Sequence, residues 1–231
     1  MFHAGARAQT TCVSLATVLA LAALLVVAPA FALPGFEADA AAGAAPDSAD
    51  GRAAVAPAVQ AYRLDNQEIR LDGHLDDAAW QSAPAARGFS VWEPDRGITP
   101  HEPTVFKVAY DEGAVYFGIA CLKGNPKDKI SAKLTRRDTF TNSDVVAIYI
   151  DPYHDHTTGY AFKVNPLGVQ QDMYIYNDGD GQDTDWDAVW EVGTSIDAQG
   201  WTAEFRIPLS QLRFGRDSSG SRVWGFQVQR D

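Results

Sequence analysis

The stretch from Tyr176 to Glu191, YNDGDGQDTDWDAVWE, holds five aspartates. A calcium ion takes about six to eight oxygen ligands, and carboxylates at this spacing could point several oxygens at one centre. The candidate calcium ligands are Asp178, Asp180, Asp183 and Asp185. The EF-hand pattern is not met, because Val189 and not a glutamate stands twelfth from Asp178. The alternative is a solvated hairpin loop, in which Asp and Gly are ordinary turn residues.

A second cluster of metal-ligating residues lies in DPYHDHTTGY, with His154, Asp155 and His156 between two apolar runs. A His-x-His pair places both rings on one side only in an extended segment. Together with Asp151 or Asp155 it could then hold zinc or iron. Pro152 and the HTTG sequence indicate a turn instead, so we expect the two rings to diverge. The segment then contributes an aromatic-rich rim made of Tyr153, His154 and Tyr160.

Aromatic residues outside the strand pattern are the candidates for stacking against a sugar, because its apolar C–H face packs on an exposed ring. Trp92 lies in a long irregular segment, Trp186 lies within the acidic loop, and Phe140 precedes a strand-like run. The alternative for Trp92 is a hydrophobic plug that closes the end of the fold. The remaining tryptophans of the folded part follow strand or helix patterns and are predicted core residues: Trp80, Trp190, Trp201 and Trp224.

Two acidic residues in predicted strands, Glu191 and Glu204, raise the hypothesis of a glycoside hydrolase. Such enzymes hold two carboxylates about 5–10 Å apart across the sugar. Each glutamate alternates with apolar neighbours, and Arg206 is a ready partner for a strand carboxylate. The chain has no GxSxG, HExxH or Walker sequence. We therefore expect binding rather than catalysis, with no catalytic residue in this module.

The N-terminus reads as a secretory signal peptide over residues 1–32. An apolar run, VSLATVLALAALLVVA, is followed by small residues at Ala30 and Ala32, which fits cleavage after Ala32. The alternative, a retained membrane anchor, is disfavoured because the run is short for a hydrocarbon core of about 30 Å. Export leaves Cys121 as the one cysteine of the mature chain, in an apolar strand pattern. The formal net charge of −11 disfavours nucleic acid as a partner.

The rest of the chain divides into a linker and one folded module. Residues 33–60 are rich in Ala, Pro, Gly and Asp and cannot repay the entropy of folding. Residues 61–231 show short alternating runs bounded by turn residues, which predict an all-β, antiparallel β-sandwich, jelly-roll-like in its connections. Short helices are predicted at 75–83 and 208–214. The predicted strands are 104–110, 114–122, 144–151, 159–166, 168–176, 188–197, 200–208 and 222–230.

Five segments resemble, in their order and spacing, the family 9 carbohydrate-binding modules and their DOMON-like relatives. These segments are IRLDGHLDDAAWQSA (69–83), VFKVAYDEGAVYFGIAC (105–121), DVVAIYID (144–151), GYAFKVNPLGVQQD (159–172) and GWTAEFRIPLSQL (200–212). The resemblance implies a sugar-binding sandwich with structural calcium. One sugar-clamping ring of the family precedes the Asp-flanked strand, where this chain has Phe140. The wording of 143–162 and 185–191 resembles the branch that stands N-terminal to outer-membrane barrel-like proteins.

We therefore expect a non-catalytic carbohydrate-binding module of an exported protein, located in the periplasm, at the outer membrane or outside the cell. Its parent protein would serve glycan breakdown or uptake. The alternative is a docking or assembly domain of an outer-membrane β-barrel protein, with a protein partner in place of sugar. Because VWGFQVQRD ends inside a predicted strand, we also expect the sandwich to lack its last strands within this sequence.

Overall fold

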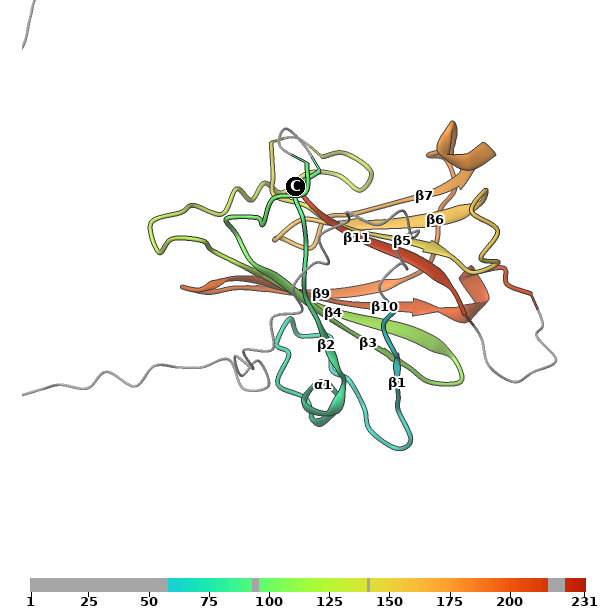
Figure 1. Cartoon of the computed structure of the whole chain (residues 1–231), viewed down its shortest axis with the longest axis horizontal. Helices are drawn as coiled ribbons and strands as arrows, with labels where there is room; N and C mark the ends of the chain where they lie inside the picture. The colour runs from blue at the N-terminus through green and yellow to red at the C-terminus, as the bar shows by residue number, and fades with distance from the viewer. Residues whose placement is uncertain (1–57, 93–95, 141, 216–222) are drawn as a thin grey trace, which may run out of the picture. The chain divides into compact units, whose positions relative to one another are not determined.

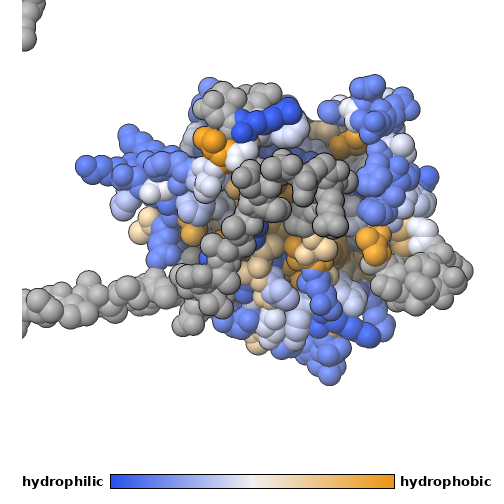
Figure 2. Space-filling view, viewed as in Figure 1, coloured by the Kyte–Doolittle hydropathy of each residue, from blue (hydrophilic) through white to orange (hydrophobic). Residues whose placement is uncertain are grey.

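The computed structural model describes residues 58–92, 96–140, 142–215 and 223–231. The predicted signal peptide and nearly all of the predicted linker lie outside these residues. Within the described ranges, no helix is both long enough and apolar enough to span a membrane. Hydrophilic residues cover most of the surface visible in Figure 2, with smaller apolar patches between them, in keeping with the acidic composition.

Two sheets pack face to face (Figure 1), which confirms the predicted sandwich. Sheet A has the order β1-β3-β4-β10-β9, with β2 also paired to β3, and sheet B has the order β11-β5-β6-β7-β8. All pairs are antiparallel except the short β1–β3 pair. The elements are β1 (Tyr62–Arg63), α1 (Ala78–Ser82), β2 (Ala85–Ala86), β3 (Thr104–Tyr110), β4 (Ala114–Leu122), β5 (Val146–Asp151), β6 (Gly159–Val164), β7 (Gln170–Tyr176), the 3₁₀ turn η1 (Asn177–Gly179), β8 (Gly181–Asp183), β9 (Glu191–Ile196), β10 (Gly200–Pro208), the 3₁₀ turn η2 (Leu209–Gln211) and β11 (Gly225–Arg230).

Alternation along the strands produces the core between the sheets. In β5, Val146, Ile148 and Ile150 point inward and are at most 1% exposed. The Trp190 ring, just before β9, stacks on Phe205 of β10 with centroids 5.5 Å apart and meets Phe162 of β6 in the opposite sheet at 5.4 Å. Trp190 and Trp201 are buried in this core as predicted, and Trp224 is half-buried against it. Trp80 is buried as predicted too, but in helix α1 and in a separate apolar cluster.

A second, smaller apolar cluster covers the outer side of sheet A. Two glycines of the sheet, which have no side chain, allow residues 69–83 to pack closely against it. Gly118 and Gly193 flank Glu204 in one row across β4, β10 and β9. A Cβ on Gly118 would lie 3.2 Å from the Trp80 ring, and a Cβ on Gly193 would lie 2.5 Å from the backbone of Leu71. The segment therefore lies directly against the backbone of the sheet.

This segment, residues 69–83, is called the clasp below. The carboxylate of Glu204 accepts hydrogen bonds from Trp80 Nε1–H and from the backbone N–H of Gly73, each at 2.7 Å. The buried Lys107 ammonium donates to the carbonyl oxygen of Trp80. Burial raises the pKa of Glu204 to about 7, although both hydrogen bonds favour its ionised form. The clasp is thus fixed through polar groups that are withdrawn from water.

Candidate functional site

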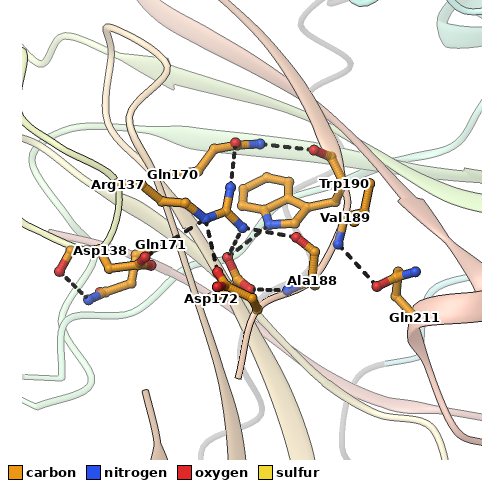
Figure 3. A network of polar contacts seen from close by, with 10 residues as sticks. Arg137, Asp138, Gln170, Gln171, Asp172, Ala188, Val189, Trp190 and Gln211 are labelled. Carbon is orange, nitrogen blue, oxygen red and sulfur yellow. Dashed lines mark hydrogen bonds and ion pairs between the residues drawn. The ribbon is translucent and has the colours of Figure 1, made fainter. Parts of the chain in front are cut away.

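A buried carboxylate on β7 fixes two loops to sheet B (Figure 3). Asp172 is 1% exposed on the inner side of the sheet and forms an ion pair with Arg137. It also accepts hydrogen bonds from the backbone N–H of Ala188 at 2.5 Å and from Trp190 Nε1–H at 3.2 Å. A buried charge is tolerated when it is both paired and hydrogen-bonded. Asp172 therefore holds the loop before β5 and the loop before β9 in fixed positions.

The guanidinium of Arg137 extends the same network. It donates to the carbonyl oxygen of Ala188 and to Gln170 Oε1, both at 2.9 Å. Gln170 in turn donates to the carbonyl oxygen of Trp190 at 3.2 Å. These contacts tie the loop that carries Phe140, three residues beyond Arg137, to β7 and to the start of β9.

On the other side of β7, Gln171 points outward and donates to the carbonyl oxygen of Asp138 at 3.3 Å (Figure 3). The same loop thus borders the outer side of sheet B. We call this side the B face. Its residues, placed by the strand register, are Ala147, Tyr149, Ala161, Lys163, Gln171, Met173, Gln227 and Gln229.

Two alanines lie at the centre of the B face, among larger and mostly polar side chains. Ala147 pairs with Lys163 and with Gln229 on its two sides, and Ala161 pairs with Tyr149. Both alanines are at most 2% exposed, whereas the side chains around them are larger and mostly polar. The amides can donate and accept hydrogen bonds, and the tyrosine ring offers an apolar face.

Lys163 is the charged residue among the B-face residues named above. Its half-buried ammonium makes no hydrogen bond and no ion pair with any residue that the structure describes, and its nearest contact of note is the Tyr149 ring, 5.9 Å from Nζ to centroid. Burial lowers the pKa of Lys163, and the charge of Asp231 opposes this shift only in part. A partly desolvated cation without a partner costs free energy, which a ligand oxygen would recover.

The comparison with known families agrees with this architecture. The model of the family described as "Carbohydrate family 9 binding domain-like" matches residues 71–230. The chain belongs to this family. No curated protein matches the chain.

One solved structure shares the fold of this family 9-like domain at low sequence identity, and two others are similar to it with TM-scores below 0.5. A putative carbohydrate-binding protein from Bacteroides uniformis is 12% identical, with a TM-score of 0.53 over 74% of this chain and 81% of the other. A family 9 module from Caldicellulosiruptor kristjanssonii in complex with cellotriose is 16% identical, with a TM-score of 0.47 over 74% and 76% of the chains. The glucose complex of a family 9 module from the same organism is 17% identical, with a TM-score of 0.45 over 74% and 85%.

The six rings predicted for ligand binding do not form one site in the family 9-like domain. Trp92 is 67% exposed with the Arg96 guanidinium 3.7 Å from its ring centroid, so it is not a buried plug. Tyr153 and His154 are exposed on the β5–β6 loop, whereas Phe140 and Trp186 are half-buried. Among the described residues, no ring contact joins Trp92 to any of the others.

Tyr160 was expected on an aromatic rim, and this prediction is wrong. The ring is 5% exposed and lies in the core, with Trp186 at 5.0 Å and Tyr174 at 5.4 Å between centroids. The physical reason is alternation, because Tyr160 shares the inner side of β6 with Phe162. Its hydroxyl accepts the backbone N–H of Arg213 at 3.2 Å, which satisfies the buried oxygen.

The acidic loop does not gather its carboxylates. η1 and β8 fold it into a short hairpin with β7, and the four predicted calcium ligands are all exposed: Asp178, Asp180, Asp183 and Asp185. Across the described part of the chain, no group of three or more His, Cys, Asp or Glu side chains is placed to hold a metal ion. The structure therefore does not bring these four side chains together around one centre, and calcium binding stays a prediction.

The two histidines were expected to diverge, and this prediction is also wrong. The ring centroids of His154 and His156 lie 4.8 Å apart. Both residues adopt left-handed backbone conformations, with φ of 53° and 59°, so a turn rather than an extended segment brings the rings together.

The two glutamates of the hydrolase hypothesis each have a structural partner in the family 9-like domain. Glu191 forms an ion pair with Arg206 at 2.8 Å on the outer side of sheet A. Glu204 is covered by the clasp and is 0% exposed. These contacts occupy both carboxylates with structural partners and do not place them on two sides of an open cleft.

Sequence reasoning missed Lys163, Tyr149 and Gln171, the polar side chains of the B face. A signal for Lys163 was present in GYAFKV, where alternation sets it opposite Phe162 and Val164. GVQQDMY gives no such signal for Gln171, because Gln171 shares its side of the strand with Met173 and the opposite side holds Gln170 and Asp172. Alternation assigns a residue to a side of a strand, but only the strand register shows that these side chains gather at one place.

Proposed function

We propose that this domain binds carbohydrate on the B face, as a non-catalytic module. The observation that carries the proposal is the half-buried Lys163 ammonium, which makes no hydrogen bond or ion pair with the described residues. Sugar hydroxyls and ring oxygens accept hydrogen bonds from such a cation. They would replace the water that burial has removed from the ammonium.

The surrounding side chains fit the same ligand class. Gln171 and Gln229 can serve both the donor and the acceptor side of a hydroxyl group. Tyr149 presents a ring beside Lys163, where an apolar sugar face can pack. The small Ala147 and Ala161 lie between these side chains. Membership of the carbohydrate family 9 binding domain-like family supports this assignment.

Phe140 is proposed as a border of the same site. Its loop is held at the B face by the Gln171 contact to Asp138 and is anchored from the inner side by Arg137. We propose further that the protein is exported, and that its parent serves glycan breakdown or uptake. A docking role beside an outer-membrane barrel remains the alternative that the binding experiment addresses.

The test is glycan binding by the full chain, on a glycan array and then by calorimetry with cellotriose and glucose as first probes, in calcium and in EDTA. We expect Lys163→Met to weaken glycan binding by about ten- to a hundredfold, because hydrogen bonds to a charged group contribute about 1.5–3 kcal/mol. Lys127→Met is the matched control, since Lys127 is exposed on a loop.

A stability measurement separates ligand recognition from folding. Because Lys163 makes no hydrogen bond or ion pair among the described residues, Lys163→Met should leave the free energy of unfolding unchanged or raise it. A folded wild-type chain that binds no glycan on the array would refute the proposal and favour the docking role. Equal glycan affinity in Lys163→Met and wild type would refute the B face as the site.

A further inference from the structure

The loop between β5 and β6 places two imidazoles next to each other at the surface. The centroids of the His154 and His156 rings are 4.8 Å apart, with 54° between the ring planes. Both residues are exposed. This pair lies outside the B face, and nothing in the proposed carbohydrate function uses it.

The backbone of the loop is held in place by two carboxylates. Asp151 Oδ2 accepts the N–H of His156 at 2.9 Å, and Asp151 Oδ1 accepts the N–H of Asp155 at 3.3 Å. Asp155 Oδ1 accepts the N–H groups of Thr157 and Thr158 at 2.8 and 2.9 Å, and these bonds lower the pKa of Asp155 to about 2. The ring pair therefore stands on a backbone that is fixed before any ligand arrives.

The left-handed conformations of the two histidines supply the geometry. In this region the side chains of residues separated by one position need not point to opposite sides, as they do in a strand. A non-glycine residue with positive φ is uncommon, and His is among the residues that tolerate it. The other described non-glycine residues with positive φ are all Asn or Asp: Asp138, Asn142, Asn177 and Asp178.

The ring separation matches that of two imidazoles on one metal ion. With a metal–nitrogen distance of about 2.0–2.1 Å, the centre of each ring lies roughly 3.2 Å from the ion. Two such rings at angles of about 90–110° have centroids roughly 4.5–5.2 Å apart. The observed 4.8 Å falls within this interval.

We propose that His154 and His156 form a surface site for a divalent transition-metal ion of the zinc, nickel and copper class. The carboxylates of Asp151 and Asp155 already accept backbone N–H groups, and no third His, Cys, Asp or Glu among the described residues completes a cluster. Water takes the remaining coordination positions. Imidazole ligands exclude calcium and magnesium, which require oxygen, and order the affinities as copper above nickel and zinc.

The test is calorimetric titration of the full chain, produced without a histidine tag, with Zn²⁺, Cu²⁺ and Ca²⁺ in separate experiments. The variants are His154→Asn and His156→Asn, because Asn accepts positive φ and preserves the loop. We expect one Zn²⁺ per chain, tighter binding of Cu²⁺, and loss of at least about tenfold in Zn²⁺ affinity for each variant.

Two controls make the result decisive. His74→Asn and His101→Asn alter exposed histidines elsewhere and should leave Zn²⁺ binding unchanged. Circular dichroism melting should show that all four variants fold. Zn²⁺ binding of equal affinity in the His154→Asn/His156→Asn double variant and wild type would overturn the proposal, as would absence of Zn²⁺ binding by the wild type. Neither outcome depends on glycan binding.

Discussion

A single buried carboxylate on β7 organises the part of the domain that borders the B face. Asp172 has three polar partners, which are a guanidinium, an indole N–H and a backbone N–H. Each hydrogen bond offsets part of the cost of removing the charge from water. The loops on both sides of the site consequently share one anchor, and its loss would affect both.

We expect Asp172→Asn to lower the free energy of unfolding by about 2–4 kcal/mol, because it removes the charge that balances Arg137 and turns one acceptor into a donor. The measurement is urea denaturation at neutral pH. Asp183→Asn, on the neighbouring strand and exposed, is the control and should change stability by less than about 0.5 kcal/mol. Equal effects of the two substitutions would show that the Asp172 network does not stabilise the fold.

At the scale of elements, the strands were predictable and their short partners were not. The strands 104–110, 114–122 and 200–208 were predicted at the bounds observed, because long alternating runs of β-branched and aromatic residues specify a half-buried surface. β1, β2 and β8 are two or three residues long and leave no periodic signal. The helix predicted at 208–214 is only the 3₁₀ turn η2, since tertiary contacts decide such short segments.

The same limit applies to the candidate site. Five of the six predicted rings are at least partly exposed, yet Tyr160 is buried because sequence alternation does not say which side of β6 faces the core. The close approach of the His154 and His156 rings depends on two positive φ angles, which the residue pattern does not predict. Lys163 is recognised as part of a candidate site only through its neighbours on β5 and β7, and these are known only from the sheet register.

The clasp depends on glycine at the element scale as well. We expect Gly193→Ala to lower the midpoint of thermal unfolding, with a destabilisation of about 1–3 kcal/mol, because the new Cβ would lie 2.5 Å from the Leu71 backbone. Gly113→Ala is the control, since its Cβ would meet nothing closer than 3.6 Å. A Gly193→Ala domain as stable as Gly113→Ala would mean that the clasp does not rest on the sheet.

At the scale of the whole molecule, the outer sides of the two sheets differ in how their polar groups are used. The outer side of sheet A is covered by the clasp and is fixed by the buried Lys107 and Glu204. On the B face, by contrast, Lys163 makes no hydrogen bond or ion pair with the described residues. Polar groups therefore stabilise one outer side, while the other has hydrogen-bonding capacity left for a ligand.

The coupling of the clasp to the fold should make global stability depend on pH through Glu204. Its pKa in the folded state, about 7, is above the ordinary value of 4.5, so the protonated form favours folding. The stability that this group contributes is complete below about pH 4.5 and is lost as the pH rises through about 7. Glu204→Gln removes the titration and mispairs one of the two N–H donors, so we expect it to cost about 1–3 kcal/mol at pH 5.

Because other carboxylates titrate in the same scan, the informative quantity is the difference in unfolding free energy between wild type and Glu204→Gln. We expect this difference to shrink by about 2 kcal/mol between pH 5 and pH 8, since ionisation of the buried carboxyl costs the wild type alone. Denaturant titrations at several pH values measure it. A difference that stays constant over this range would mean that the folded and unfolded states bind the Glu204 proton equally, and that the clasp shields the carboxylate less than its contacts imply.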